Sequence, residues 1–173
     1  MRILGIDPGT RRCGYGVIEG ERGRLSYVEC GVIEPPAKAP LAERLAELWA
    51  GLGDVIGELA PSVMAVEDIF HGIDARAALT LGHARGVVLA AAGAAGILVH
   101  SYPPATVKRS VTGYGRAAKP QVCAVVQTLL ALKRVPRADA ADALAVAICH
   151  AHHAPAAARI ALAHSASEPR RVR

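Results

Sequence analysis

The sequence predicts an α/β fold in which helices flank a mixed five-stranded sheet, and three observations carry that prediction. Five short apolar runs end at turn residues, as buried strands do. The later runs are separated by segments with apolar residues at helical spacing, which favours parallel strand pairs with helices on the faces of the sheet. Hydrophobic residues make up 52% of the 173 residues, enough for one domain with one substantial core.

Three strands are expected before any helix. The run RILGID at residues 2–7 ends at an acid and is followed by PGT, which predicts a buried strand that leads into a turn. The runs CGYGVIEG at 13–20 and GRLSYVECGVI at 23–33 flank a turn at ERG. This pattern is typical of a hairpin of half-buried strands.

The remaining strands are expected to alternate with helices. Residues 41–60 carry leucines at helical spacing, and Pro61 ends that helix. Residues 62–68 predict the fourth strand, residues 74 to about 95 a helix rich in small residues, and residues 96–102 the fifth strand. The rest of the chain is expected to be mostly helical.

The last residues differ in composition from the rest. Residues 155–173 combine a weak apolar stretch with a cluster of arginines at Arg170, Arg171 and Arg173. We expect a domain of residues 1–154 followed by a basic, flexible tail of residues 155–173.

The cysteines and the apolar runs predict a cytoplasmic protein. The four cysteines (Cys13, Cys30, Cys123 and Cys149) form no C-x-x-C pair and follow no secretory leader, so we expect reduced thiols. The most apolar run, at 86–99, is shorter than the roughly twenty residues that a membrane span needs. No membrane insertion is therefore expected.

The charges are distributed unevenly along the chain. Residues 1–74 hold seven basic and twelve acidic residues, whereas residues 75–138, the basic segment, hold nine basic residues and no acid. Lysines and arginines on one surface supply most nonspecific affinity for nucleic acid, so the basic segment favours a DNA-binding face. A solvated basic surface is the alternative. The candidate contacts in this segment include Arg76, Arg85, Arg116, Lys108 and Lys119.

Four acids are predicted to meet at one edge of the sheet. Asp7 ends the first strand and Glu67 the fourth, and ligands of open α/β sheets bind at that edge. Asp139 and Asp142 are three residues apart on one face of a helix. Each acid alone has an ordinary explanation. Asp139 suits an N-cap, Asp142 a first helical turn and Asp7 a turn start, and Glu67 could pair with a nearby arginine.

Together, the four carboxylates predict a site for divalent cations. They cannot all stay charged side by side without cations, and oxygen ligands favour Mg²⁺, with Mn²⁺ as a substitute. Two such ions about 4 Å apart would clamp the attacking and leaving oxygens of a phosphodiester. The basic segment would then hold the flanking strands.

Several motifs resemble one family. The stretches ILGIDPGTRRCGYGVIE, AVEDIF, ALTLGHARGV and ADAADALAVAICH, in this order and spacing, are similar to those of the RuvC family of bacterial Holliday junction resolvases. The resemblance runs from Met1 to about Ala151. It implies a ribonuclease-H-like fold, a homodimer, and Mg²⁺-dependent paired incisions with two ions per active site in four-way junction DNA. It also implies a role in homologous recombination and DNA repair, with the RuvA/RuvB branch-migration complex as a partner.

The resemblance also assigns roles to particular residues. The family's catalytic, metal-binding carboxylates fall on Asp7, Glu67, Asp139 and Asp142. Its junction-stacking aromatic falls on Phe70, the only phenylalanine, and its DNA-contacting lysines fall on Lys108 and Lys119. Pro120, directly after Lys119, departs from the family pattern.

Other functions stay open from the sequence alone. DPGT also satisfies the short phosphate-loop pattern of the actin and sugar-kinase class, but this chain is too short to hold the two similar halves of those proteins. Another ribonuclease-H-like nuclease, such as the ribosomal-RNA-processing type, and a junction-binding protein without chemistry are the remaining alternatives. The histidines at His150, His152 and His153 suggest a metal site, but histidines at a helix end are the commoner explanation.

A dimer surface is predicted on the helix at residues 74–95. Ala78, Gly82, Gly86 and Ala90 recur every four residues, and such a small-residue stripe lets a second helix approach closely. Two symmetric cuts require two active sites, which a C₂ dimer provides. Packing of the stripe onto the chain's own sheet is the alternative.

Overall fold

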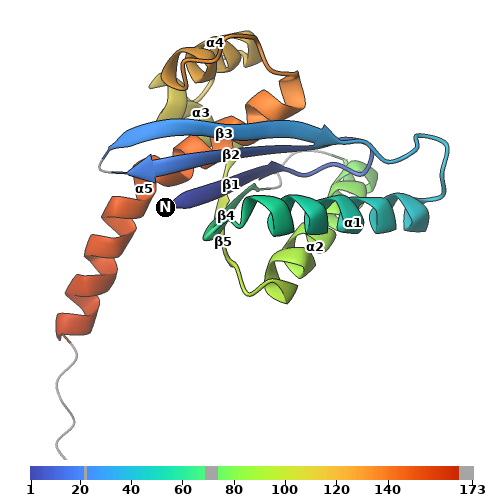
Figure 1. Cartoon of the computed structure of the whole chain (residues 1–173), viewed down its shortest axis with the longest axis horizontal. Coiled ribbons are helices and arrows are strands. Elements are labelled where there is room, and N and C mark those ends of the chain that lie inside the picture. Colours follow the sequence, from blue (N-terminus) through green and yellow to red (C-terminus); the bar gives the residue numbers. More distant parts are fainter. Residues whose placement is uncertain (22, 69–73, 168–173) are drawn as a thin grey trace, which may run out of the picture.

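The computed structural model describes residues 1–21, 23–68 and 74–167, with side chains through residue 154. This part of the chain contains the five strands that the sequence predicts, together with five helices (Figure 1). The strands are β1 (Arg2–Asp7), β2 (Cys13–Glu21), β3 (Arg24–Ile33), β4 (Val63–Glu67) and β5 (Leu98–Tyr102). The helices are α1 (Leu41–Leu59), α2 (Ala75–Ala94), α3 (Pro104–Thr112), α4 (Lys119–Leu129) and α5 (Ala138–Ser167).

The strands form one mixed sheet in the order β3-β2-β1-β4-β5. The first three strands pair antiparallel, while β4 runs parallel to both β1 and β5. The β1–β4 register pairs Ile6 with Val66, so the next residues, Asp7 and Glu67, end neighbouring strands at the same edge. The expected α/β class and the mixed sheet are confirmed.

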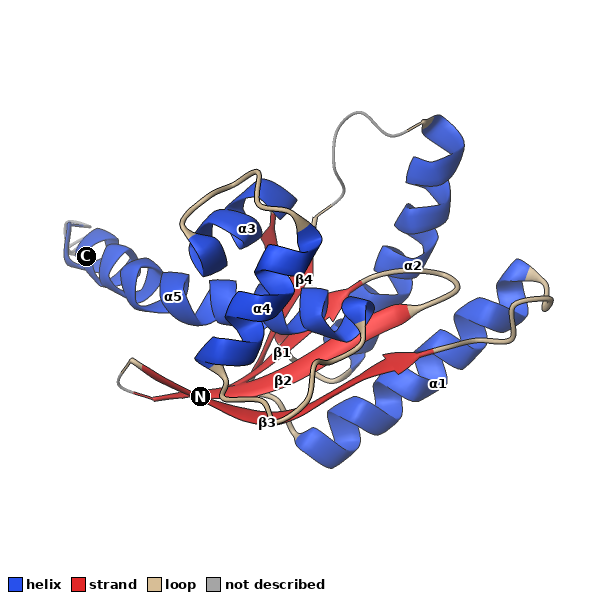
Figure 2. Ribbon diagram, turned by 90° about the horizontal axis from the view of Figure 1, so that it is seen from above, coloured by secondary structure: helices blue, strands red, loops and turns tan. Residues whose placement is uncertain are grey.

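Helices cover both faces of the sheet, and each face has its own core. Helices α1 and α2 lie on one side, and α3, α4 and α5 lie on the other (Figures 1 and 2). The first core contains Leu4, Leu48 and Val88, all fully buried. The second contains Ile3, Val126 and α5 from Leu144 to Cys149. The alternation of strand side chains between the two cores explains why the β1 sequence is apolar throughout.

Two glycines let α5 lie unusually close to the sheet. A Cβ atom on Gly5 of β1 would overlap the carbonyl oxygen of Ala143, and one on Gly14 of β2 would overlap the carbonyl oxygen of Asp139. Backbone can approach backbone this closely only where a side chain is missing. Gly14 therefore helps to fix the height at which the first turn of α5, and with it Asp139, stands above the sheet.

Helix α2 begins at a side-chain cap. The carboxylate of Asp74 accepts hydrogen bonds from the backbone N–H groups of Arg76 and Ala77, both at 3.0 Å. This satisfies two of the N–H groups that have no partner within a helix. The cap fixes the start of the helix one residue from the predicted position.

Helix α5 extends past Pro155 to Ser167, whereas the sequence predicts a flexible tail from residue 155. The helix thus crosses the expected boundary. The division into a domain of residues 1–154 and a basic tail of residues 155–173 stays a prediction.

Candidate active site

The two strand-end acids, Asp7 and Glu67, are neighbours. Parallel pairing of β1 and β4 places them side by side, and their carboxyl groups share a hydrogen bond. Both are half-buried. Asp142 on α5 acts electrostatically on both, and Asp139 acts on Asp7. The four predicted acids are therefore brought together at the carboxyl edge of the sheet.

The crowding of carboxyl groups shifts their protonation. Burial raises the pKa of Asp7 to about 8, and the charges of Glu67 and Asp142 add to that effect. Burial and Asp142 also raise the pKa of Glu67. A nearby positive charge would favour the ionised forms of Asp7 and Glu67. The site is thus electrostatically prepared for cations.

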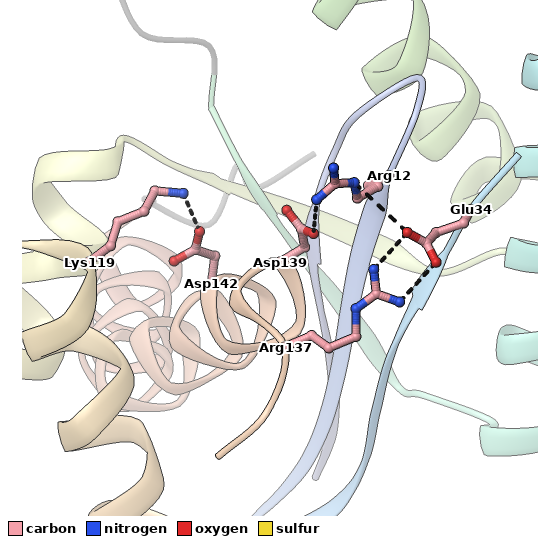
Figure 3. A network of polar contacts seen from close by, with 6 residues as sticks. All are labelled: Arg12, Glu34, Lys119, Arg137, Asp139 and Asp142. Atoms are coloured by element: carbon pink, nitrogen blue, oxygen red, sulfur yellow. Dashed lines mark hydrogen bonds and ion pairs between the residues drawn. The ribbon is translucent and has the colours of Figure 1, made fainter. Parts of the chain in front are cut away.

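Side-chain cations already lie against the two aspartates of α5 (Figure 3). The Lys119 ammonium, from the start of α4, lies 2.6 Å from Oδ2 of Asp142. Arg12, from the β1–β2 loop, places Nη1 3.7 Å from Oδ2 of Asp139. Each aspartate is thus paired with a basic side chain of the same protein, and the two basic side chains come from different segments.

Arg12 belongs to a wider network that sequence reasoning missed. Its Nε lies 3.8 Å from Oε1 of Glu34, and Glu34 accepts two hydrogen bonds from Arg137, at 2.6 and 2.8 Å. This network ties the end of β3 to the residues before α5. The register of the β2–β3 hairpin could have predicted one of these contacts. Cys13 pairs with Ile33, so Arg12 and Glu34 flank the same end of the hairpin.

The donor chemistry fits hard divalent cations, although the acids are not yet arranged around one. Among the described residues, no group of three or more Asp, Glu, His or Cys side chains is placed to hold a metal ion as it stands. The nearby ligands are all carboxylate oxygens, which is the donor set of Mg²⁺, Mn²⁺ and Ca²⁺. Burial, together with the charges of Glu67 and Asp142, raises the pKa of Asp7, and the charge of Lys119 opposes that rise.

The family follows from comparison with known proteins. The sequence profile of the family described as "Crossover junction endodeoxyribonuclease RuvC" matches residues 3–150. The chain belongs to the RuvC family. A RuvC of Rhodopseudomonas palustris is 52% identical over 160 residues, which are 92% of this chain and 92% of that protein.

Solved RuvC structures share the fold. The structure of RuvC from Thermus thermophilus is 35% identical, covers 91% of this chain and 97% of its own, and superposes with a TM-score of 0.82. The same organism's RuvC in complex with Holliday junction substrate gives a TM-score of 0.84, with coverages of 91% and 96%. The ribonuclease-H-like fold is confirmed, and membership of the RuvC family sets aside the ATP-binding alternative. It also makes the chain a nuclease of a family that depends on divalent metal.

Lys108 lies in the same pocket as two of the acids. Together with Lys119, Glu67 and Asp142 it lines a pocket of about 160 Å³ at the edge of the sheet. Arg76 lines a larger pocket of about 680 Å³ that reaches Asp139 and the β1–β2 loop. Both basic residues thus line pockets that contain at least one of the four acids.

The other proposed DNA contacts differ in their surroundings. Arg116 is exposed in the loop between α3 and α4. Arg85 instead faces inward with 17% of its side chain exposed, hydrogen-bonded to Ser101 at 2.9 Å and paired with Asp68 at 3.3 Å. It joins α2 to β4 and β5. Phe70 lies outside the described residues.

The histidines of the RuvC chain are not at a helix end, because α5 continues well past them. His150 is buried, accepts or donates a hydrogen bond with the Tyr102 hydroxyl at 2.8 Å, and lies 4.7 Å from the His100 ring. Burial lowers the pKa of His150 to about 4, so the ring is neutral near neutral pH. The explanation from helix ends was wrong, since sequence spacing alone did not show how long α5 is.

Proposed function

We propose that this chain resolves four-way DNA junctions by paired symmetric incisions, with Asp7, Glu67, Asp139 and Asp142 as its catalytic carboxylates. The observation that carries the proposal is the convergence of these acids, from β1, β4 and α5, at one sheet edge beside the basic segment. The relatives named for crossover junction endonuclease activity support it. A role in recombination and repair follows from that activity.

The carboxylates would hold two Mg²⁺ ions, with Mn²⁺ as a substitute. When bound, the ions supply the Lewis acid that activates water and stabilises the leaving oxygen. The chain's own residues define where that chemistry occurs. Asp7 and Glu67 are fixed by the strands, while Asp139 and Asp142 are fixed by the close contact of α5 with the sheet.

The basic residues are proposed to position the DNA. Lys108 and Lys119 would contact phosphates beside the acids, and Arg76 and Arg116 would contact the flanking strands. Arg85 remains a candidate contact of lower exposure than the rest. Phe70 would stack on bases at the crossover, which suits an aromatic side chain of this family.

Lys108→Ala is expected to weaken junction binding through charge alone. Loss of one phosphate contact should flatten the plot of log affinity against log salt concentration by about one unit. Fluorescence anisotropy with a labelled junction over a range of salt measures the slope. Lys38→Ala, in the loop before α1, serves as the control, and an unchanged slope for Lys108→Ala would make Lys108 a solvated residue.

We propose further that the chain works as a C₂ dimer through α2. The small-residue stripe does not pack onto the chain's own sheet, because Gly82 and Gly86 have open space where a Cβ would stand. The buried residues of α2 lie on another face, at Ala84, Val88, Ala91 and Ala92. The apolar side chains of Leu79 and Leu89 are 63% and 39% exposed. A second copy of α2 would cover this surface.

By length and hydropathy alone, α2 also qualifies as a membrane span, and 22% of that window is buried. We favour a dimer contact over membrane insertion for α2. Small residues at every fourth position also suit a pair of helices in water, and the proposed substrate of the acid site is DNA. We also propose that the protein acts in the cytoplasm and that the RuvA/RuvB complex is one of its partners.

Gly86→Leu is expected to give a folded monomer that cuts one strand at a time. A Cβ atom at this position meets nothing within 4 Å, while a leucine side chain would fill the space that a second helix needs. Sedimentation velocity measures the assembly, and a cruciform plasmid distinguishes a nicked from a linear product. Gly57→Leu, at an open position of α1, is the matched control. A dimer of Gly86→Leu that still makes paired cuts would exclude the stripe as the interface.

The function is tested by substrate choice. We expect Mg²⁺-dependent, symmetric cutting of a labelled synthetic four-way junction, with far slower cutting of duplex, single-stranded DNA and RNA. Preferred cutting of structured RNA would instead favour the ribosomal-RNA-processing alternative. Tight junction binding without cutting in either metal would favour the non-catalytic alternative.

A further inference from the structure

The shorter of the two ion pairs at the acid cluster is made by a mostly exposed lysine. Lys119 lies 2.6 Å from Asp142, with 71% of the lysine side chain exposed and only 20% of the aspartate side chain. The lysine thus reaches from solvent onto a nearly buried acid. Its charge also acts on Asp7 and Glu67. The ammonium of Lys119 therefore offsets the negative charge of this cluster, as a bound metal ion would.

The backbone of Lys119 is held by the start of α4, whereas its side chain is long and mostly exposed. Lys119 is the first residue of α4, and Pro120 follows it at a position where proline suits a helix start. The backbone N–H of Ala118 donates to the side chain of Gln121 at 2.9 Å, which closes the start of the helix. A flexible four-carbon stem on a fixed base lets the ammonium change partner while the helix stays in place.

A divalent ion and this ammonium would compete for the same carboxylate. Both need the charge of Asp142, and two cations within a few ångströms repel each other in a partly buried site. An ion that binds Asp142 would therefore displace the ammonium of Lys119. The pocket that Lys119 shares with Lys108 opens at the same edge, where a DNA phosphate would lie.

We propose that Lys119 is the resident counter-ion of the metal-free site, and that metal binding moves it from Asp142 to a phosphate of the junction. This inference rests on the proposed function and deepens it. It makes metal binding and junction binding mutually supportive, because each favours the state in which Lys119 has left Asp142. An ordinary phosphate-binding lysine would contribute equally with and without metal.

Lys119→Met tests the exchange, since methionine keeps much of the stem and removes the charge. Calorimetric titration with Mn²⁺, without DNA, should show affinity several-fold tighter than that of the wild type. Lys119→Arg keeps a competing cation and should stay near the wild type. Lys133→Met, in the loop after α4, is the control for loss of a surface charge and should change nothing.

Junction affinity provides the second measurement. Salt slopes are compared in EDTA and in Ca²⁺, with gels that confirm uncut junction. In EDTA the slopes of Lys119→Met and the wild type should agree, whereas in Ca²⁺ the variant should be about one unit flatter. Equal flattening in both conditions, or unchanged Mn²⁺ affinity, would overturn the exchange. A wild type that binds neither Mn²⁺ nor the junction would overturn the proposed function itself.

Discussion

Asp142→Asn is expected to abolish cleavage while junction binding persists or strengthens. The amide keeps the shape of the side chain but not the charge that would hold a metal ion. Substitution of residues that merely orient a metal ligand typically costs 10- to 100-fold in metal affinity or activity, so loss of a ligand itself should cost at least about 100-fold. The same direction is expected for Asp139→Asn, Asp7→Asn and Glu67→Gln.

Binding should not suffer, because the lost charge lies where phosphate would approach. The variant also loses the partner of Lys119, which leaves that ammonium free for DNA. Single-turnover cleavage and anisotropy on the same junction separate the two effects. Asp54→Asn, an exposed acid on α1, is the control. Wild-type cutting by folded Asp142→Asn would remove Asp142 from the catalytic set.

Gly14→Ala is expected to damage both stability and cleavage. The new methyl group would overlap the carbonyl oxygen of Asp139, which is backbone and cannot turn aside. Forcing an extra carbon into a packed contact typically costs about 1–3 kcal/mol of unfolding free energy. If α5 instead shifts by about 1 Å to make room, Asp139 moves with it, and such misplacement can reduce a rate on the order of 100-fold.

Gly53→Ala on α1 is the matched control for that variant. A Cβ at Gly53 meets nothing within 4 Å, and alanine in an exposed helix should stabilise by about 0.5–1 kcal/mol. Urea unfolding and junction cleavage are measured on both variants. Wild-type stability and rate in Gly14→Ala would mean that the first turn of α5 is not held by contact with β2.

The fold and the four acids were predictable because local patterns determine them. The spacing of apolar residues predicted five strands and the helices between them. The point where an apolar run stops also predicts where a strand ends. Asp7 and Glu67 needed only the parallel pairing of β1 and β4 in addition. The spacing of three residues between Asp139 and Asp142 places them on one helical face, whatever packs against that helix.

The parts that escaped prediction depend on long side chains and on distant pairings. Arg12, Glu34 and Arg137 come from three segments, and only the hairpin register brings two of them together. Arg85 belonged to a basic segment, but its guanidinium turns inward to Ser101. The prediction that His150 lies at a helix end was wrong, because the length of α5 is a property of the folded chain. The contact of His150 with Tyr102 likewise depends on the fold.

The position of α5 at the end of the fold has a consequence for synthesis. The sheet is complete at Tyr102, yet all three helices that cover its second face follow that residue in the sequence. A ribosome makes the chain from the N-terminus, so a growing chain carries Asp7 and Glu67 long before Asp139 and Asp142 exist. Helix α5 therefore both completes the cover of the second face and brings in the last two acids. A chain that ends before α5 would leave part of the second face of the sheet uncovered and would lack Asp139 and Asp142.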